Sequence, residues 1–215
     1  QGTTGATLDP VMVLGQEIEL PARTTVQLAA VTLAAPTRQA ALELARRYRA
    51  WTTVDRVFPR AQTEAEREMR QVEMTSPMLE QTQQLLALLL YPHFARRADA
   101  SALNANRMGQ SGLWQFGISG DLPILLLHMN DEAEAELLQE LLRAHAYWRR
   151  RGLGINLVIL NRQSSNYGLT MQDFIQRMIQ RTENGNWLNQ RRGIFVLRAD
   201  QISEADRVLL LAVAR

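Results

Sequence analysis

The side chains best suited to chemistry gather around a glycine-rich stretch, residues 109–120, in this sequence of 215 residues. Gln110 and Trp114 lie in it, and Asp121 follows it directly. An indole can stack on a sugar ring, while an amide and a carboxylate bond the hydroxyls of the sugar. Gln110, Trp114 and Asp121 are therefore predicted as a candidate carbohydrate-binding platform.

A structural role explains the same stretch without a ligand. Trp114, Phe116 and Ile118 would fill the core, the glycines would permit tight turns, and Asp121 would cap backbone donors before the following strand. Apolar residues that flank a strand usually pack, so the sequence favours this second interpretation and leaves the first one open.

Further polar residues follow three apolar segments in the second half of the chain, at Asn130–Asp131, 161–167 and 198–200. In an open parallel sheet, ligands bind outside the carboxyl ends of the strands. Asn161, Tyr167 and Asp200 are therefore also candidate carbohydrate-binding residues, by analogy of fold alone. The alternative is that Asn130 and Asp200 are ordinary helix-entry or turn residues.

Catalytic and metal-binding residues are not predicted. The acidic residues lie mostly in first helical turns or on solvated faces, whereas a glycosidase needs two carboxylates in one cleft. His93, His128 and His145 are too scattered to indicate a metal site. The chain has no cysteine and no lysine, which excludes thiol and Schiff-base chemistry. The glycines precede a strand rather than follow one, so they do not fit a dinucleotide-binding fingerprint.

The elements that would position these residues repeat as strand then helix from residue 122 onward. Apolar strands are predicted at 122–129, 155–160 and 194–197, followed by helices at 131–151 and 170–181 and by a last helix that Ser203 caps. Continuous apolar strands between amphipathic helices predict an α/β fold with a small three-stranded parallel sheet and right-handed crossovers.

The first half of the chain has a different pattern. Residues 7–20 and 24–33 predict an antiparallel β-hairpin that ends a β-sandwich. Helices follow. The first is predicted at 36–50, and its apolar stripe continues after a break at Thr52-Thr53 until Pro59. A second helix is predicted to begin at Thr63, and Pro77 is expected to end or kink it.

The most apolar helix is predicted at 79–90, before Tyr91-Pro92, and is expected to be buried on most sides. A partner-binding surface is the alternative for it. These patterns predict closing sandwich strands at 1–35, a helical connector at 36–108, and the glycine-rich loop with the α/β unit at 109–215.

Composition limits the partners. The net charge is only +2, with arginines interleaved among acids, so nucleic acid is not an expected partner. No apolar run approaches the roughly 20 residues that a membrane span needs. The first residues lack a starting methionine, and we expect the chain to be a segment of a longer protein.

Several stretches, in the right order, resemble the bacterial cyclic β-1,2-glucan synthases in the region related to cellobiose phosphorylases. Two come from the loop, Gly109-Gln-Ser-Gly-Leu-Trp114 and Gly117-Ile-Ser-Gly-Asp-Leu-Pro-Ile124, and one from the start, Gly2-Thr-Thr-Gly-Ala-Thr-Leu-Asp-Pro10. The others are Arg143-Ala-His-Ala-Tyr-Trp148, Leu157-Val-Ile-Leu-Asn161 with Tyr167, and Ile194-Phe-Val-Leu-Arg-Ala-Asp-Gln-Ile-Ser203. One position departs from the family, which often has an acidic residue where this chain has Arg162.

This resemblance implies a piece of a large, multi-domain enzyme at the cytoplasmic face of the bacterial inner membrane. Such an enzyme polymerises glucose from UDP-glucose, with a divalent metal bound elsewhere, cyclises the chain and trims it by phosphorolysis. The segment itself is then expected to bind no cofactor and to be a non-catalytic module that contacts neighbouring domains of the same polypeptide. The alternative is a carbohydrate-binding module for the β-1,2-glucan chain.

Overall fold

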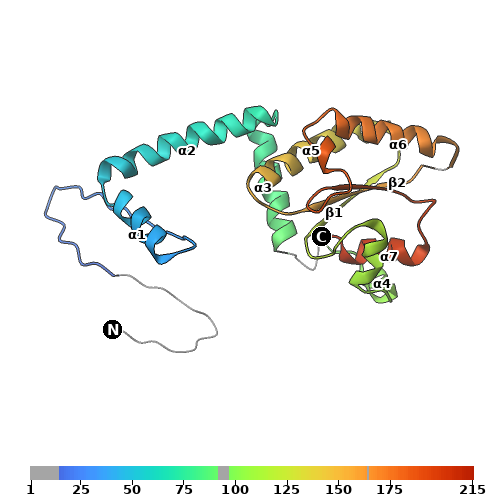
Figure 1. Cartoon of the computed structure of the whole chain (residues 1–215), viewed down its shortest axis with the longest axis horizontal. Coiled ribbons are helices and arrows are strands. Elements are labelled where there is room, and N and C mark those ends of the chain that lie inside the picture. The colour runs from blue at the N-terminus through green and yellow to red at the C-terminus, as the bar shows by residue number, and fades with distance from the viewer. Residues whose placement is uncertain (1–14, 92–96, 164) are drawn as a thin grey trace. The chain divides into compact units, whose positions relative to one another are not determined.

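The computed structural model describes residues 15–91, 97–163 and 165–215, without the side chains of 165–169. The chain divides into two compact units, Gln1–Arg60 and Ala61–Arg215. Figure 1 shows helices in the first unit and a small sheet with helices on both faces in the second.

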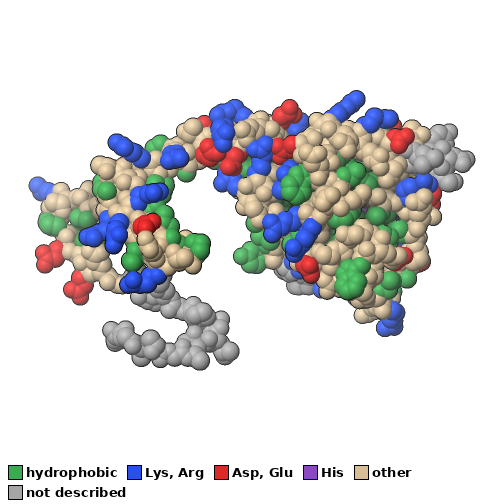
Figure 2. Space-filling model, in the orientation of Figure 1, with side chains coloured by type: hydrophobic (Ala, Val, Ile, Leu, Met, Phe, Trp, Pro, Cys, Tyr) green, Lys and Arg blue, Asp and Glu red, His purple; other side chains and the backbone are tan. Residues whose placement is uncertain are grey.

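In the first unit, residues 15–35 form no strand. Thr24 donates from its backbone N–H and from Oγ1 to the Pro21 carbonyl, at 3.3 and 2.8 Å, so a turn lies where the hairpin was expected to bend. The predicted hairpin is not confirmed, and residues 7–14 lie outside the described residues. A two-stranded ribbon is marginal in water by itself. The apolar side chains of this stretch, Leu20 and Leu28 among them, stay exposed, and Figure 2 shows hydrophobic side chains on the surface of this unit.

Helix α1 spans Arg38–Arg47, inside the predicted 36–50, and Thr37 Oγ1 caps it by accepting from Ala40 N at 3.2 Å. Helix α2 spans Trp51–Gln71 without interruption, so the expected break, the stop at Pro59 and the new start at Thr63 are wrong. A proline removes one backbone donor, and here the neighbouring turns keep the helix continuous. A capping box at Thr63 would use the carboxylate of Glu66. That carboxylate instead accepts from Gln62 Nε2 at 3.1 Å.

Helix α3 spans Ser76–Leu90, and Pro77 lies in its first turn rather than at the end of the preceding helix. A proline is tolerated there because its missing N–H would have no helical partner. The helix ends before Tyr91, as predicted, but Thr82 and Leu89 are its only buried residues. The expectation that it is buried on most sides is therefore wrong.

The second unit contains the predicted parallel sheet. Strands β1 (Ile124–Met129), β2 (Asn156–Asn161) and β3 (Ile194–Arg198) lie in the order β1-β2-β3, and both pairs are parallel. Leu127 is paired with Ile159, which is paired with Val196. All residues of β2 are buried, because this strand has neighbours on both edges and helices on both faces.

Helical elements connect and cover the strands. They are α4 (Ala100–Ala105), the 3₁₀ helices η2 (Gln110–Phe116), η3 (Glu132–Glu134) and η4 (Gly185–Trp187), and helices α5 (Ala135–Arg150), α6 (Ser165–Gln180) and α7 (Glu204–Val213). Helix α6 begins before the expected Thr170 cap. The predicted cap of α7 is confirmed as a capping box, in which Asp206 N donates to Ser203 Oγ at 3.1 Å.

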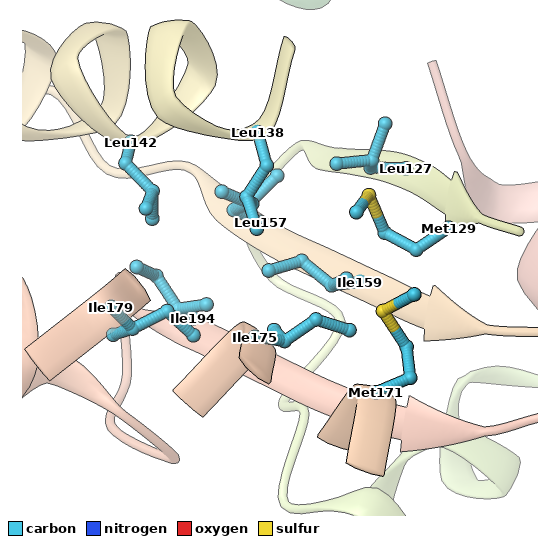
Figure 3. Packing of buried hydrophobic residues seen from close by; sticks show 10 residues of the cluster. All are labelled: Leu127, Met129, Leu138, Leu142, Leu157, Ile159, Met171, Ile175, Ile179 and Ile194. Atoms are coloured by element: carbon cyan, nitrogen blue, oxygen red, sulfur yellow. The ribbon is translucent and has the colours of Figure 1, made fainter. Parts of the chain in front are cut away.

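Alternating side chains of the strands fill two separate cores, as a pleated sheet requires. On one face, Leu127, Leu157 and Ile159 pack against α5 and α6 (Figure 3). On the other face, Val158 and Phe195 pack against α7 and the glycine-rich loop. The loop therefore forms part of the core that holds the sheet.

A test of this packing is the substitution Gly193→Ala, just before β3. A Cβ atom at this position would lie 2.6 Å from the Gln190 carbonyl oxygen and closer still to that of Trp187. Backbone atoms cannot yield as a flexible side chain can, so we expect a loss of about 2–4 kcal/mol in the free energy of unfolding, measured by urea titration. The control is Gly109→Ala, where a Cβ meets nothing within 4 Å. Equal stability of the two variants would contradict this prediction.

Candidate functional site

The three loop candidates are joined by hydrogen bonds: two of them donate to one backbone carbonyl, and the third accepts from one of these two. Gln110 Nε2 donates to the Ser119 carbonyl at 2.7 Å and to Asp121 Oδ1 at 3.0 Å. Trp114 Nε1 donates to the same carbonyl at 3.4 Å. Arg191 Nη2 lies 3.8 Å from Asp121 Oδ2. We call Gln110, Trp114, Asp121 and Arg191 the amino-edge cluster, because Asp121 and Arg191 each lie three residues before the first residue of a strand.

The residues of the glycine-rich loop differ in how far their side chains are exposed to solvent. The Trp114 residue is 64% exposed, so it does not fill the core as the favoured interpretation expected. Leu113 and Ile118 take that role, because both are fully buried against β2, β3 and α7. Gly117 and Gly120 have φ angles of 73° and 79°, which confirms that these two glycines make turns that other residues rarely adopt.

The other candidates lie after the strands. Asn161 ends β2 and is buried, and its Oδ1 accepts from Gln163 N at 3.0 Å. Asp200 accepts from Arg198 Nε at 3.0 Å and from Nη2 at 2.6 Å, and this hydrogen bonding lowers the pKa of the Asp200 carboxyl. Tyr167 lies in α6, and its side chain is outside the described residues.

These six candidates form two groups rather than one site. All three strands are parallel, so residues that precede a strand lie at one edge of the sheet and residues that follow a strand lie at the opposite edge. A strand of six residues spans about 20 Å. A ligand of ordinary size held by Gln110 and Trp114 is therefore not also held by Asn161 and Asp200.

The turn after β1 is closed by its own side chains. Glu134 accepts from Asn130 N at 2.6 Å and from Asn130 Nδ2 at 2.8 Å, and these bonds lower the pKa of the Glu134 carboxyl. Asp131 caps the next turn by accepting from Ala133 N at 2.8 Å. The interpretation of Asn130 as a helix-entry residue agrees with this geometry.

A buried histidine, His145, joins α5 to the start of β2. Its Nδ1 lies 3.3 Å from Asn184 Oδ1, and its Nε2 lies 3.2 Å from the Ile155 carbonyl oxygen. Asn184 is itself fixed, because its Nδ2 donates to the Leu142 carbonyl at 2.9 Å. These contacts give His145 a structural role. Within the described ranges, no group of three His, Cys, Asp or Glu residues is arranged to hold a metal ion, and His93 lies outside those ranges.

One cluster of charges, around Arg149, Arg150 and Glu183, was not predicted from the sequence. The Arg149 guanidinium carbon lies 4.4 Å from the centre of the Trp187 ring, and its Nη2 lies 3.4 Å from Glu183 Oε1. Arg150 also hydrogen-bonds Glu183, which lowers the pKa of that carboxyl. The partners are more than thirty residues apart, so no local spacing signals the contact.

Comparison with known proteins decides the relationship. A model of the glycosyl hydrolase 94 supersandwich domain matches residues 1–51, which fits a β-sandwich at the start of the chain. Over all 215 residues the chain is 34% identical to the cyclic beta-(1,2)-glucan synthase NdvB of Rhizobium meliloti (strain 1021). The chain matches a segment of a cyclic β-1,2-glucan synthase. The predicted resemblance is confirmed, and the chain spans 8% of the length of that synthase.

Among the helices of the described residues, none combines the length and the apolar character that crossing a bilayer requires.

The buried histidine predicts how stability depends on pH. Burial lowers the pKa of His145, and burial also lowers that of His128. The unfolded chain binds a proton near pH 6.5, while the folded chain binds it only at lower pH, so stability falls as the pH drops from 7 to 5. Urea titrations across this range should show the fall, and His145→Gln should show a smaller one. A wild-type stability that does not change between pH 7 and pH 5 would contradict the prediction.

Proposed function

We propose that this segment is a non-catalytic module that packs against neighbouring domains of the same polypeptide within a cyclic β-1,2-glucan synthase. The observation that carries the proposal is the exposed apolar surface of the first unit. Leu28 is 65% exposed and Phe58 is 72% exposed, and both line a groove of about 780 Å³. Contiguous apolar surface of this kind is typical of an interaction site.

The polar side chains support the same proposal. Asp121 accepts from Gln110, Asp200 from Arg198, and Glu183 from Arg150. Carboxylates engaged in this way hold loops and helix ends in place. A pair of carboxylates facing one cleft would instead support hydrolysis of a glycosidic bond.

The rest of the proposal follows from the relative's name and from the resemblance. The parent would make a β-1,2-glucan from UDP-glucose, using a divalent metal bound outside this segment. It would be a glycosyltransferase with a phosphorylase-like region, held at the cytoplasmic face of the bacterial inner membrane. The segment would connect its sugar-processing modules.

The double substitution Leu28→Ser and Phe58→Ser tests this proposal. In the chain ending at Arg215 both side chains are largely exposed, so we expect no measurable change in melting temperature. In a longer form of the synthase, where a neighbouring domain covers them, we expect a loss of about 1.5–3 kcal/mol for each side chain. Arg60→Ser, also exposed on α2, is the control and should have no effect in either form. Unchanged stability of the double variant in the longer form would refute the packing role.

One observation favours a second function, binding of the glucan chain. Trp114 exposes its indole beside the amide of Gln110, the carboxylate of Asp121 and the guanidinium of Arg191. An exposed aromatic ring next to hydrogen-bonding groups is the arrangement on which a sugar ring stacks.

Titration with linear and cyclic β-1,2-glucans, measured by isothermal titration calorimetry, separates the two functions. If the amino-edge cluster binds glucan, Trp114→Ala abolishes a saturable response and leaves the melting temperature unchanged, because the side chain is mostly exposed. Trp51→Ala is the control, since Trp51 is also exposed but lies in the first unit. Binding that survives Trp114→Ala, or a variant that simply unfolds, would remove the amino-edge cluster as a glucan site. Absence of any response in the wild-type chain favours the packing role.

A further inference from the structure

Strand β1 lies at an edge of the sheet, and its backbone groups alternate between two directions. The Pro123 carbonyl accepts from Asn156 N at 2.9 Å, and the Met129 carbonyl accepts from Arg162 N at 2.9 Å. The odd-numbered residues therefore present their backbone groups to β2. In a strand the even-numbered residues must then present theirs to the outer edge. Within the part of the chain that the structure describes, the outward groups of Leu126 and His128 have no backbone partner.

The end of the chain has already begun to pair with this outer edge. After α7, Ala214 forms a parallel bridge with Ile124, and Arg215 N donates to the Ile124 carbonyl at 3.0 Å. Ala214 has extended backbone angles, φ −64° and ψ 149°. Figure 1 shows the C-terminus beside β1.

The path of the chain between β3 and Ala214 has the form of a complete crossover. Helices α5 and α6 pack on one face while the chain advances from β1 to β2 to β3, and α7 packs on the opposite face. Strand connections in a parallel sheet are right-handed. A connection that runs back across the sheet therefore places its helix on the face opposite to α5 and α6. The position of α7 is therefore the one required to bring a further parallel strand next to β1.

The outer edge of β3 is different. There Leu188 bridges Ile194, and Asn189 N donates to the Ile194 carbonyl at 2.8 Å. These residues belong to the segment that leads directly into β3, with no helical crossover between them. Only β1 is thus approached by a chain that has passed through a strand and a helix.

We propose that the outer edge of β1 receives a fourth parallel strand, formed by the polypeptide that continues from Ala214 in the synthase. The matched relative is far longer than this chain, which covers 8% of it. A synthase of that length has further polypeptide that can form the strand. The sheet then has the order β3-β2-β1 followed by the new strand. Leu126 N–H donates to the Arg215 carbonyl, and the Leu126 carbonyl accepts from the second residue beyond Arg215.

A fourth strand changes where a ligand pocket can form. From β1 to β3 the chain adds strands on one side of β1, and after α7 it adds the new strand on the other side of β1, so the strand order reverses beside β1. Open α/β sheets bind ligands at the carboxyl end of such a reversal. That place lies next to His128 and Asn130, not between Asn161 and Asp200.

Amide hydrogen exchange tests the proposal, because neighbouring amides of β1 serve as controls for each other. In the chain ending at Arg215, Leu126 and His128 should exchange fast while Leu125 and Leu127, which donate toward β2, exchange slowly. In a longer form that continues past Arg215, Leu126 and His128 should slow by more than about tenfold, as expected for amides that enter a ladder. Equal exchange of Leu126 and His128 in the two forms, whether fast or slow, would overturn the proposal.

A matched pair of variants of the longer form isolates the pairing. Arg215→Pro removes the N–H that donates to the Ile124 carbonyl, whereas Arg215→Ala keeps it. Both lose the contact from Arg215 Nη1 to the Leu89 carbonyl, so that contact cancels in the comparison. We expect fast exchange at Leu126 and His128 in Arg215→Pro and slow exchange in Arg215→Ala. Slow exchange in both variants would show that something other than this strand covers the edge.

Discussion

The second unit depends on the complete enclosure of β2. This strand pairs with β1 and β3, and its side chains enter the cores on both faces of the sheet. Asparagines mark the two ends of the strand. Asn156 Oδ1 accepts from Arg192 N at 3.1 Å, and Asn161 Oδ1 accepts from Gln163 N, so each buried amide holds the loop beside it. Buried polar groups need such partners, and these two define where the apolar strand stops.

Local and uniform patterns were readable from the sequence. The apolar runs predicted all three strands, because a strand that is buried on both faces is a continuous apolar run without alternating polar residues. The cap at Ser203 and Asp206 was predicted because its partners lie within one helical turn. The hairpin was not confirmed, since its pairing depends on strands that the pattern alone does not supply. The break at Pro59 was wrong because the helical hydrogen bonds of the neighbouring turns outweigh one lost donor.

The candidate site was less readable. Sequence order placed Gln110, Trp114 and Asp121 together correctly, since they are joined by a short loop. It did not reveal that Leu113 rather than Trp114 enters the core, because both are apolar neighbours on a 3₁₀ helix and only the position of α7 selects between them. The contact between Arg149 and Trp187 joins the last turn of α5 to η4, which are far apart in the sequence, and so it left no local signal.

The composition of β1 bears on how the segment behaves when it is prepared alone. Proteins commonly protect a strand edge with charged residues, prolines or bulges. Residues 124–129 read Ile-Leu-Leu-Leu-His-Met, with no acidic residue, no arginine and no proline. An edge of this composition is a template for the strands of other molecules. Concentrated solutions of the segment are therefore expected to aggregate edge to edge, and the proposed fourth strand would remove this exposed edge.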